Sequence, residues 1–150
     1  MLVAESLQRK WYPDGLCFGC GPANEDGLRL ESFPDGNEVV ARWSASPIHR
    51  AGPEVVAGGI VGTLLDCHTG AAVLRAVWER DGKVPYVDGA PWVTRSYQVE
   101  LRRATPLDRP IELRAKVVEL DEDRAVAQGH IEVDGKVTAT IRAEWRRLPN

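Results

Sequence analysis

The chain has little of several features that would assign it to particular classes of protein. Only three of its 150 residues are cysteine, one is methionine and 7% are aromatic. So few cysteines, in an odd number, exclude a disulfide-dense secreted scaffold and favour reduced thiols. Basic residues are not in excess either, because 19 Lys and Arg stand against 22 Asp and Glu, a net charge of −3. The overall charge therefore gives no reason to expect nucleic acid as a partner.

Neither a targeting segment nor a membrane span is expected. The first residues, MLVAESLQRKWYPDG, have no positive stretch followed by a long apolar core, which argues against a secretory signal and favours the cytoplasm. The most apolar stretch, residues 55–74, is interrupted by polar residues and glycines: Gly58, Gly59, Gly62, Asp66, His68 and Gly70. We therefore expect a buried helix of a soluble protein over this stretch.

The composition, 43% hydrophobic and 27% charged, fits a single globular domain over residues 1–150, with residues 1–27 as an N-terminal segment. Between residues 28 and 43, two extended runs flank PDGN, which predicts a hairpin. Apolar and polar residues then alternate in four runs, at residues 93–101 and in IELRAKVVEL, AVAQGHIEV and KVTATIRAEW. This period predicts four strands, and Asp134-Gly135 predicts a tight turn between the last two. Their short connections favour an antiparallel meander.

Residues 58–79 contain no proline and carry apolar side chains on most helical faces, which predicts one long helix enclosed on nearly all sides. Such a helix is about 33 Å long, and a strand of about ten residues has the same length. One helix can therefore lie along a whole sheet, with a second copy of the chain covering what the sheet leaves open. The predicted fold class is α+β, a hotdog fold in which an antiparallel sheet wraps around one long central helix.

Asp66 is unusual in its position within the predicted helix. Between residues 55 and 74 it is the one side chain that must be considered charged at pH 7. An unpaired carboxylate in an apolar setting is costly, so it has to be solvated, paired or protonated. Asp66 therefore either points to solvent or to an arginine at a subunit interface, or it takes part in chemistry.

Gly58 and Gly59 lie where the helix is expected to begin, so their N–H groups have no acceptor within the helix and can stabilise an oxyanion. Alternatively, the two glycines only allow close backbone packing. Gly58 and Asp66 are separated by about 12 Å along a helix, whereas an oxyanion donor must lie about 3 Å from its target. If the two groups act together, the amide and the carboxylate come from different subunits and meet at a dimer interface.

Three segments resemble hotdog-fold thioesterases of the PaaI type. GGIVGTLLD, residues 58–66, is similar to the segment that opens their central helix, usually His-Gly-Gly followed seven residues later by Asp or Glu. CFGCGPANEDGLRL resembles an N-terminal segment common in these proteins, and VELRRATPLDRPIELRAKVVEL resembles their strand with an R-x-T-P-L turn. The resemblance covers nearly all of the chain from Cys17 onward.

This resemblance implies that paired subunits hydrolyse an acyl-CoA, or a related acyl thioester, to free acid and CoA. Asp66 would be the nucleophile or the general base that activates water. Gly58 would donate its amide N–H to the thioester carbonyl. Gly59, the next residue, would contact the substrate. The resemblance implies no metal and no organic cofactor. CoA takes part only as a portion of the substrate.

The chain departs from the family pattern in two places. Ala57 stands where a His before Gly-Gly is usual, and Ala51 stands where a loop amide is often found, with His49 as the candidate to replace it. These departures motivate a second hypothesis, a non-catalytic hotdog protein that binds acyl-CoA. A hydratase ranks last, because no His lies in a matching place to pair with the carboxylate.

Cationic contacts are needed for the phosphates of CoA, since the protein is acidic overall. Arg102 and Arg103, beside the turn ATPLDR, are the candidates for this contact. The alternative is that they only form a solvated face of a strand. The sequence leaves open which acyl group is bound and whether dimers stack into tetramers.

Cys17-x-x-Cys20 has the spacing of half a zinc site, which Cys67 and His68 would have to complete. Neighbouring side chains on a helix diverge by about 100°, so Cys67 and His68 are poorly placed to bind one ion together. We therefore expect packing roles for the cysteines and no metal, and a core or interface position for His68.

The five tryptophans are scattered along the sequence. Most are expected to pack in the core or at an interface, and one or two are candidates to line an acyl tunnel.

Overall fold

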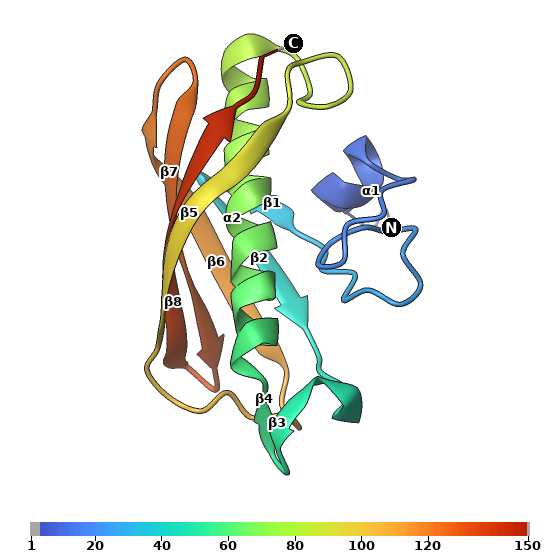
Figure 1. The fold of residues 1–150 in the computed structure, drawn as a ribbon, viewed down its shortest axis with the longest axis vertical. Coiled ribbons are helices and arrows are strands. Elements are labelled where there is room, and N and C mark those ends of the chain that lie inside the picture. The colour runs from blue at the N-terminus through green and yellow to red at the C-terminus, as the bar shows by residue number, and fades with distance from the viewer. Residues whose placement is uncertain (1–3, 150) are drawn as a thin grey trace.

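The computed structural model describes residues 4–149, which form one six-stranded antiparallel sheet with a long helix along it (Figure 1). The helix is α2 (Gly58–Asp81). In the order β1-β2-β6-β7-β8-β5, the sheet comprises β1 (Phe33–Asp35), β2 (Glu38–Trp43), β6 (Ile111–Leu120), β7 (Arg124–Val133), β8 (Lys136–Arg147) and β5 (Trp92–Leu101). Short elements complete the fold: α1 (Leu7–Trp11), η1 (Pro47–His49), β3 (Arg50–Gly52) and β4 (Val55–Val56). The predicted α+β class is confirmed.

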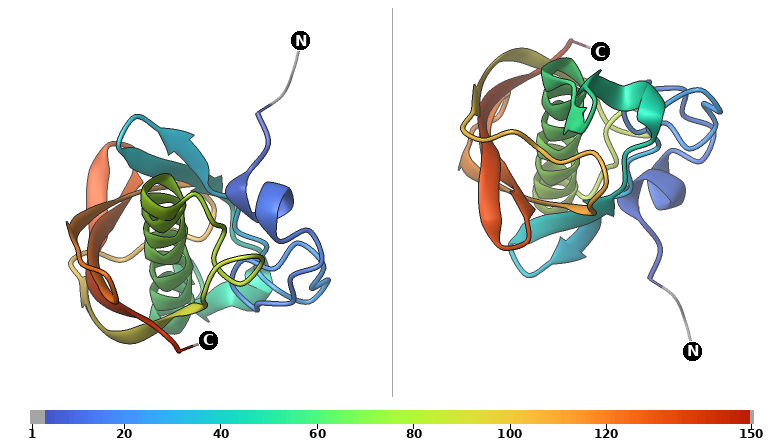
Figure 2. Two further views of the ribbon diagram at one scale, coloured as in Figure 1. Left: turned by 90° about the horizontal axis from the view of Figure 1, so that it is seen from above. Right: turned by 90° about the horizontal axis from the view of Figure 1, so that it is seen from below.

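α2 is enclosed from two sides. The sheet curves around one side of the helix and residues 4–32, including α1, cover another side (Figure 2). The helix ends two residues beyond the predicted residue 79, because Gly82 adopts a left-handed conformation with φ 71° and donates its N–H to the Trp78 carbonyl at 2.8 Å. Among the described residues α2 alone is long and apolar enough to span a membrane by length and composition. Its position in the core confirms the prediction of a buried helix.

Alanines on the facing strands allow α2 to lie close to the sheet. β7 and β8 turn fully buried alanines toward the core: Ala125, Ala127, Ala139 and Ala143. The larger side chains of Leu64, Leu65 and Val73 fill the space on the helix side and are also fully buried. At Gly70, a β-carbon would lie 2.7 Å from the ring of Trp145. Small residues at these positions therefore set the distance between the helix and the sheet.

The predicted strands are present, with two differences in pairing. The first hairpin forms, but β1 starts only at Phe33. The N–H groups of Leu28 and Leu30 donate to the carbonyls of Phe18 and Gly19 instead of pairing with a strand. β6, β7 and β8 form the predicted meander, with φ of 51° and 77° at the Asp134-Gly135 turn. β5, however, pairs with β8 and lies at the sheet edge, while β6 pairs with β2. The prediction of four neighbouring strands in series was therefore wrong for β5.

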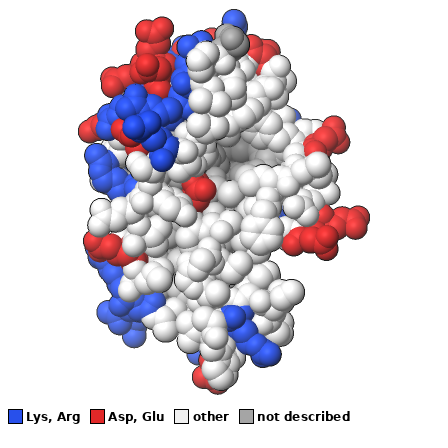
Figure 3. Space-filling view, in the orientation of Figure 1, with Lys and Arg blue, Asp and Glu red and all other residues white. Residues whose placement is uncertain are grey.

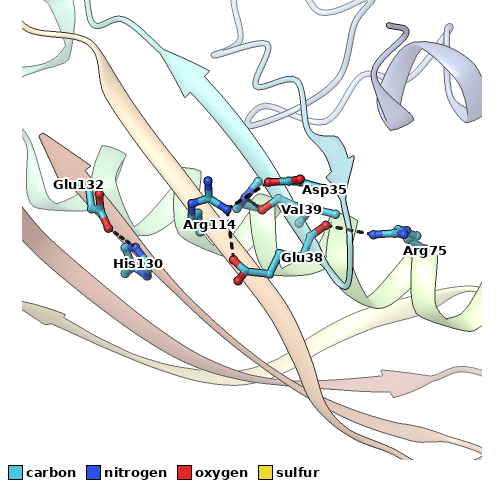
Figure 4. Close-up of polar contacts among 8 residues, drawn as sticks. Asp35, Glu38, Val39, Arg75, Arg114, His130 and Glu132 are labelled. Carbon is cyan, nitrogen blue, oxygen red and sulfur yellow. Dashed lines mark hydrogen bonds and ion pairs between the residues drawn. The ribbon is translucent and has the colours of Figure 1, made fainter. Parts of the chain in front are cut away.

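Charged groups occupy the outer face of the sheet, which points away from α2 (Figure 4). Arg114 on β6 lies 3.3 Å from Asp35 and 3.6 Å from Glu38. His130 on β7 lies 2.8 Å from Glu132. These pairs are partly exposed to water, so they contribute solubility rather than much stability.

His68 is a fully buried residue of the core, as predicted. Its Nδ1 accepts a hydrogen bond from the Ser32 hydroxyl at 2.8 Å, and its Nε2 donates to the Val39 carbonyl at 2.9 Å. Burial lowers the pKa of His68 to about 4, so the ring is neutral near pH 7. Both ring nitrogens are thus used to join α2 to β2 and to the segment before β1.

We expect His68→Ala to lower the free energy of unfolding by about 3 kcal/mol, because it leaves a cavity and two buried polar groups without partners. Urea denaturation followed by circular dichroism measures the change. His130→Ala, on the outer face, is the matched control and should cost about 0.5 kcal/mol or less. Similar costs for both variants would contradict the assigned role of His68.

Candidate active site

Asp66 lies in the first half of α2, on the side that meets the start of the edge strand β5. Its Oδ1 accepts a hydrogen bond from the Thr94 hydroxyl at 2.7 Å. Thr94 is near the start of β5, so the contact joins the helix to the edge strand. The carboxyl group is half-buried and borders a pocket. Asp66 is therefore neither fully solvated nor paired with an arginine within the described chain.

The pocket beside Asp66 has a volume of about 540 Å³, within the range of roughly 300–1,000 Å³ that is usual for small-molecule sites. Its walls are α1 and residues 12–22 on one side, α2 on another, and the start of β5. Three of the five tryptophans line it: Trp11, Trp92 and Trp145. A hollow opens on this face of the molecule and is surrounded mostly by uncharged residues (Figure 3). The setting suits an apolar ligand.

The surroundings of Asp66 make its carboxylate a stronger base than an exposed aspartate. Burial raises its pKa, and the nearby Cys17 raises it further. The hydrogen bond from Thr94 acts in the opposite direction, because it stabilises the charged form. A carboxylate of this kind both accepts a proton more readily and remains within reach of a ligand in the pocket.

Two tyrosines hold the outer wall of the pocket in place. The Tyr12 hydroxyl donates to the Pro85 carbonyl at 2.8 Å, and its ring meets that of Tyr86 edge-on at 6.3 Å. These contacts tie the N-terminal segment to the loop of residues 82–91. Sequence reasoning missed Thr94 and Tyr12, because nothing in the local pattern connects them to Asp66.

The helix N-terminus forms a second group of candidate residues. α2 begins at Gly58, after Ala57, and both Gly58 and Gly59 are exposed. Within residues 4–149 no acceptor binds the N–H of either glycine. The Ala57 N–H donates to the His49 carbonyl at 2.8 Å, which places His49 beside the helix start. The His49 ring accepts the Ser46 N–H at 3.0 Å and packs on Trp43.

Arg102 and Arg103 belong to the same end of the molecule. A β-carbon on Gly58 would lie 3.0 Å from the side chain of Leu101, the last residue of β5. The N–H groups of Arg102 and Arg103 both donate to the Thr138 carbonyl, at 2.8 and 3.0 Å. The Arg102 guanidinium also lies 3.5 Å from Glu100. Both arginine side chains are exposed.

One subunit does not bring its two candidate catalytic groups together. Gly58 and Asp66 lie on the same uninterrupted helix, so about 12 Å of helix separates them. Gly59 and His49 lie beside Gly58, and Arg102 and Arg103 follow Leu101, whose side chain is near Gly58. Asp66 borders a pocket further along the helix. β5 connects the two places. Among residues 4–149 no strand pairs with its outer edge, and its Tyr97 and Leu101 side chains are exposed.

Comparison with known proteins identifies the fold. No family model and no curated protein matches the chain. A thioesterase superfamily protein from Shewanella loihica PV-4 matches with a TM-score of 0.64 and 24% identity, over 85% of this chain and 98% of that one. The E. coli PaaI protein from the phenylacetic acid degradation operon matches with a TM-score of 0.67 and 16% identity, over 82% of each chain. A phenylacetic acid degradation-related protein from Ralstonia eutropha JMP134 matches with a TM-score of 0.66 and 20% identity, over 79% of this chain and 85% of that one.

These matches, together with the central helix and the six-stranded sheet, define a hotdog-fold protein. The predicted fold class is thereby confirmed. Among solved structures the chain is similar to PaaI and to thioesterase superfamily proteins, which confirms at the level of the fold the resemblance seen in the sequence.

Proposed function

We propose that this protein is a thioesterase that hydrolyses an acyl-CoA, or a related acyl thioester, to a free acid and CoA. The observation that carries the proposal is the half-buried carboxyl of Asp66, which borders an apolar pocket on a fold that thioesterase superfamily proteins share. The single domain over residues 1–150 and the cytoplasmic location stay predictions from the sequence.

Asp66 supplies the chemistry of the proposed reaction in one of two ways. As a general base it takes a proton from water while the water oxygen attacks the thioester carbonyl carbon. As a nucleophile it attacks that carbon itself, and water then hydrolyses the mixed anhydride. In both cases the C–S bond breaks, and CoA leaves as a thiolate that takes up a proton. The Gly58 N–H stabilises the carbonyl oxygen while it carries negative charge.

The complete site, in this proposal, lies between two subunits. The separation of Gly58 from Asp66 along one helix favours a partner subunit as the source of the amide. The free edge of β5 and its exposed apolar side chains suit contact with a second copy. The uncharged surface around the hollow in Figure 3 fits the same contact. The protein then works as a homodimer, or as a dimer of dimers.

The residues near the helix N-terminus would bind the CoA part of the substrate. Gly59 lies beside the proposed oxyanion donor, and His49 lies beside the helix start. The Arg102 and Arg103 guanidinium groups are exposed close to Leu101 and can contact phosphates. Apart from CoA as part of the substrate, the proposal needs no cofactor.

A panel of short, medium, long and aromatic acyl-CoAs tests the proposal, with free CoA measured by chromatography. Because three tryptophans line the pocket, we expect kcat/KM to be highest for short or aromatic acyl groups. Calorimetry with the same compounds measures affinity separately. Measurable affinity without turnover on any thioester would overturn the proposal and favour a non-catalytic acyl-CoA-binding protein. Ala57, which stands where a His is usual, also motivates this alternative.

A further inference from the structure

The three cysteines of the chain meet beside the candidate active site. The Sγ atoms of Cys17, Cys20 and Cys67 all lie within 4.8 Å of one another, and those of Cys17 and Cys67 lie 3.7 Å apart. Cys17 and Cys20 come from the turn that follows α1, whereas Cys67 comes from the middle of α2. All three are free thiols. The fold thus brings together three sulfur ligands from positions up to 50 residues apart.

The spacing of these sulfurs fits a shared metal ion. Two thiolates bound to Zn²⁺ at about 2.3 Å with tetrahedral angles lie about 3.8 Å apart, close to the 3.7 Å between Cys17 and Cys67. A disulfide would need sulfurs about 2.05 Å apart and would leave one of the three thiols over. A shared ion therefore uses all three groups with less movement than a disulfide.

The turn that carries Cys17 and Cys20 is built tightly against Cys67. A β-carbon on Gly19 would lie 2.3 Å from the Cys67 sulfur, and one on Gly21 would lie 2.4 Å from the Cys17 nitrogen. The Gly21 N–H closes the turn by donating to the Cys17 carbonyl at 2.8 Å. Glycine at both positions is thus required for the thiols to converge.

We propose that Cys17, Cys20 and Cys67 bind one Zn²⁺ ion as three thiolate ligands and so fasten the N-terminal segment to α2. Binding replaces the thiol protons, which pass to solvent. His68 does not complete the site, because its nitrogens bind Ser32 and Val39. The three cysteines line the same pocket as Asp66. The site goes beyond the proposed hydrolysis and fixes a wall of its pocket.

Zinc titration of the reduced, metal-free protein against a chromophoric chelator tests this site. We expect one equivalent to bind, and Cys20→Ser and Cys67→Ser each to weaken binding at least about 100-fold. His130→Gln removes a metal-binding side chain on the outer face of the sheet and should leave the affinity unchanged. Binding below one equivalent, or binding that the serine variants retain, would overturn the proposal.

Two further readouts use the wild-type chain, so that a serine variant that fails to fold does not decide the matter. Co²⁺ should give thiolate-to-metal charge-transfer absorption, and Zn²⁺ should protect all three cysteines from alkylation, as counted by mass spectrometry. A cobalt spectrum without thiolate bands, or thiols that react equally fast with and without Zn²⁺, would refute the site. Neither readout depends on turnover, so their failure is distinct from failure of the proposed hydrolysis.

Discussion

Asp66→Asn is expected to lower kcat for thioester hydrolysis by about 10²- to 10⁴-fold, the usual contribution of a positioned general base. Asparagine has nearly the same shape, and its amide oxygen can still accept the hydrogen bond from Thr94 that Asp66 accepts at 2.7 Å. The fold and the pocket should therefore persist, while the group that accepts a proton or attacks the carbonyl is lost. Steady-state kinetics measure the loss, and calorimetry with a non-hydrolysable acyl-CoA analogue should show retained affinity.

Asp81→Asn is the matched control for this variant. Asp81 ends the same helix at its exposed C-terminal end and pairs with Arg80 at 2.7 Å, away from the pocket of Asp66. The same change of side chain there should alter kcat by less than about twofold, as expected for a surface position. Full turnover in Asp66→Asn would remove Asp66 from the mechanism.

Gly58→Pro should lower kcat by about 10²- to 10³-fold, because it deletes one oxyanion donor. Gly58 is the first residue of α2, where proline is tolerated since the helix itself does not use that N–H. Ala57 has φ −58° and ψ 137°, the extended conformation that a residue before proline prefers. Gly58→Ala keeps the N–H and displaces only the end of the Leu101 side chain, so it should retain most of the activity.

Mixing the two inactive variants tests whether the site is shared between subunits. In a twofold dimer of Asp66→Asn with Gly58→Pro, one of the two sites keeps both Asp66 and Gly58. Random exchange of subunits at equal concentrations should then restore about a quarter of the wild-type activity per subunit. If no activity returns although mixed dimers form, as shown by native mass spectrometry, both groups act within one subunit and the interface proposal fails.

Several features of the site were visible in the sequence because they depend on neighbouring residues. An acid within an apolar run marked Asp66, and paired glycines marked the helix start. Thr94, which binds Asp66, carried no such signal, because its hydroxyl is ordinary in an alternating strand. The spacing of Cys17 and Cys20 was visible, but the position of Cys67 beside them depends on how the N-terminal segment packs on α2.

By itself the sequence determined the elements: the long helix, the alternating strands, and the turn at Asp134-Gly135. These follow from periodicity and turn chemistry, which act over a few residues. Only the tertiary structure decided that β5 lies beside β8 at the sheet edge, that residues 4–32 cover α2, and that the pocket of Asp66 lies between them. Such contacts join residues distant in the chain, and they are chosen by the packing of whole surfaces, which no local pattern of residues specifies.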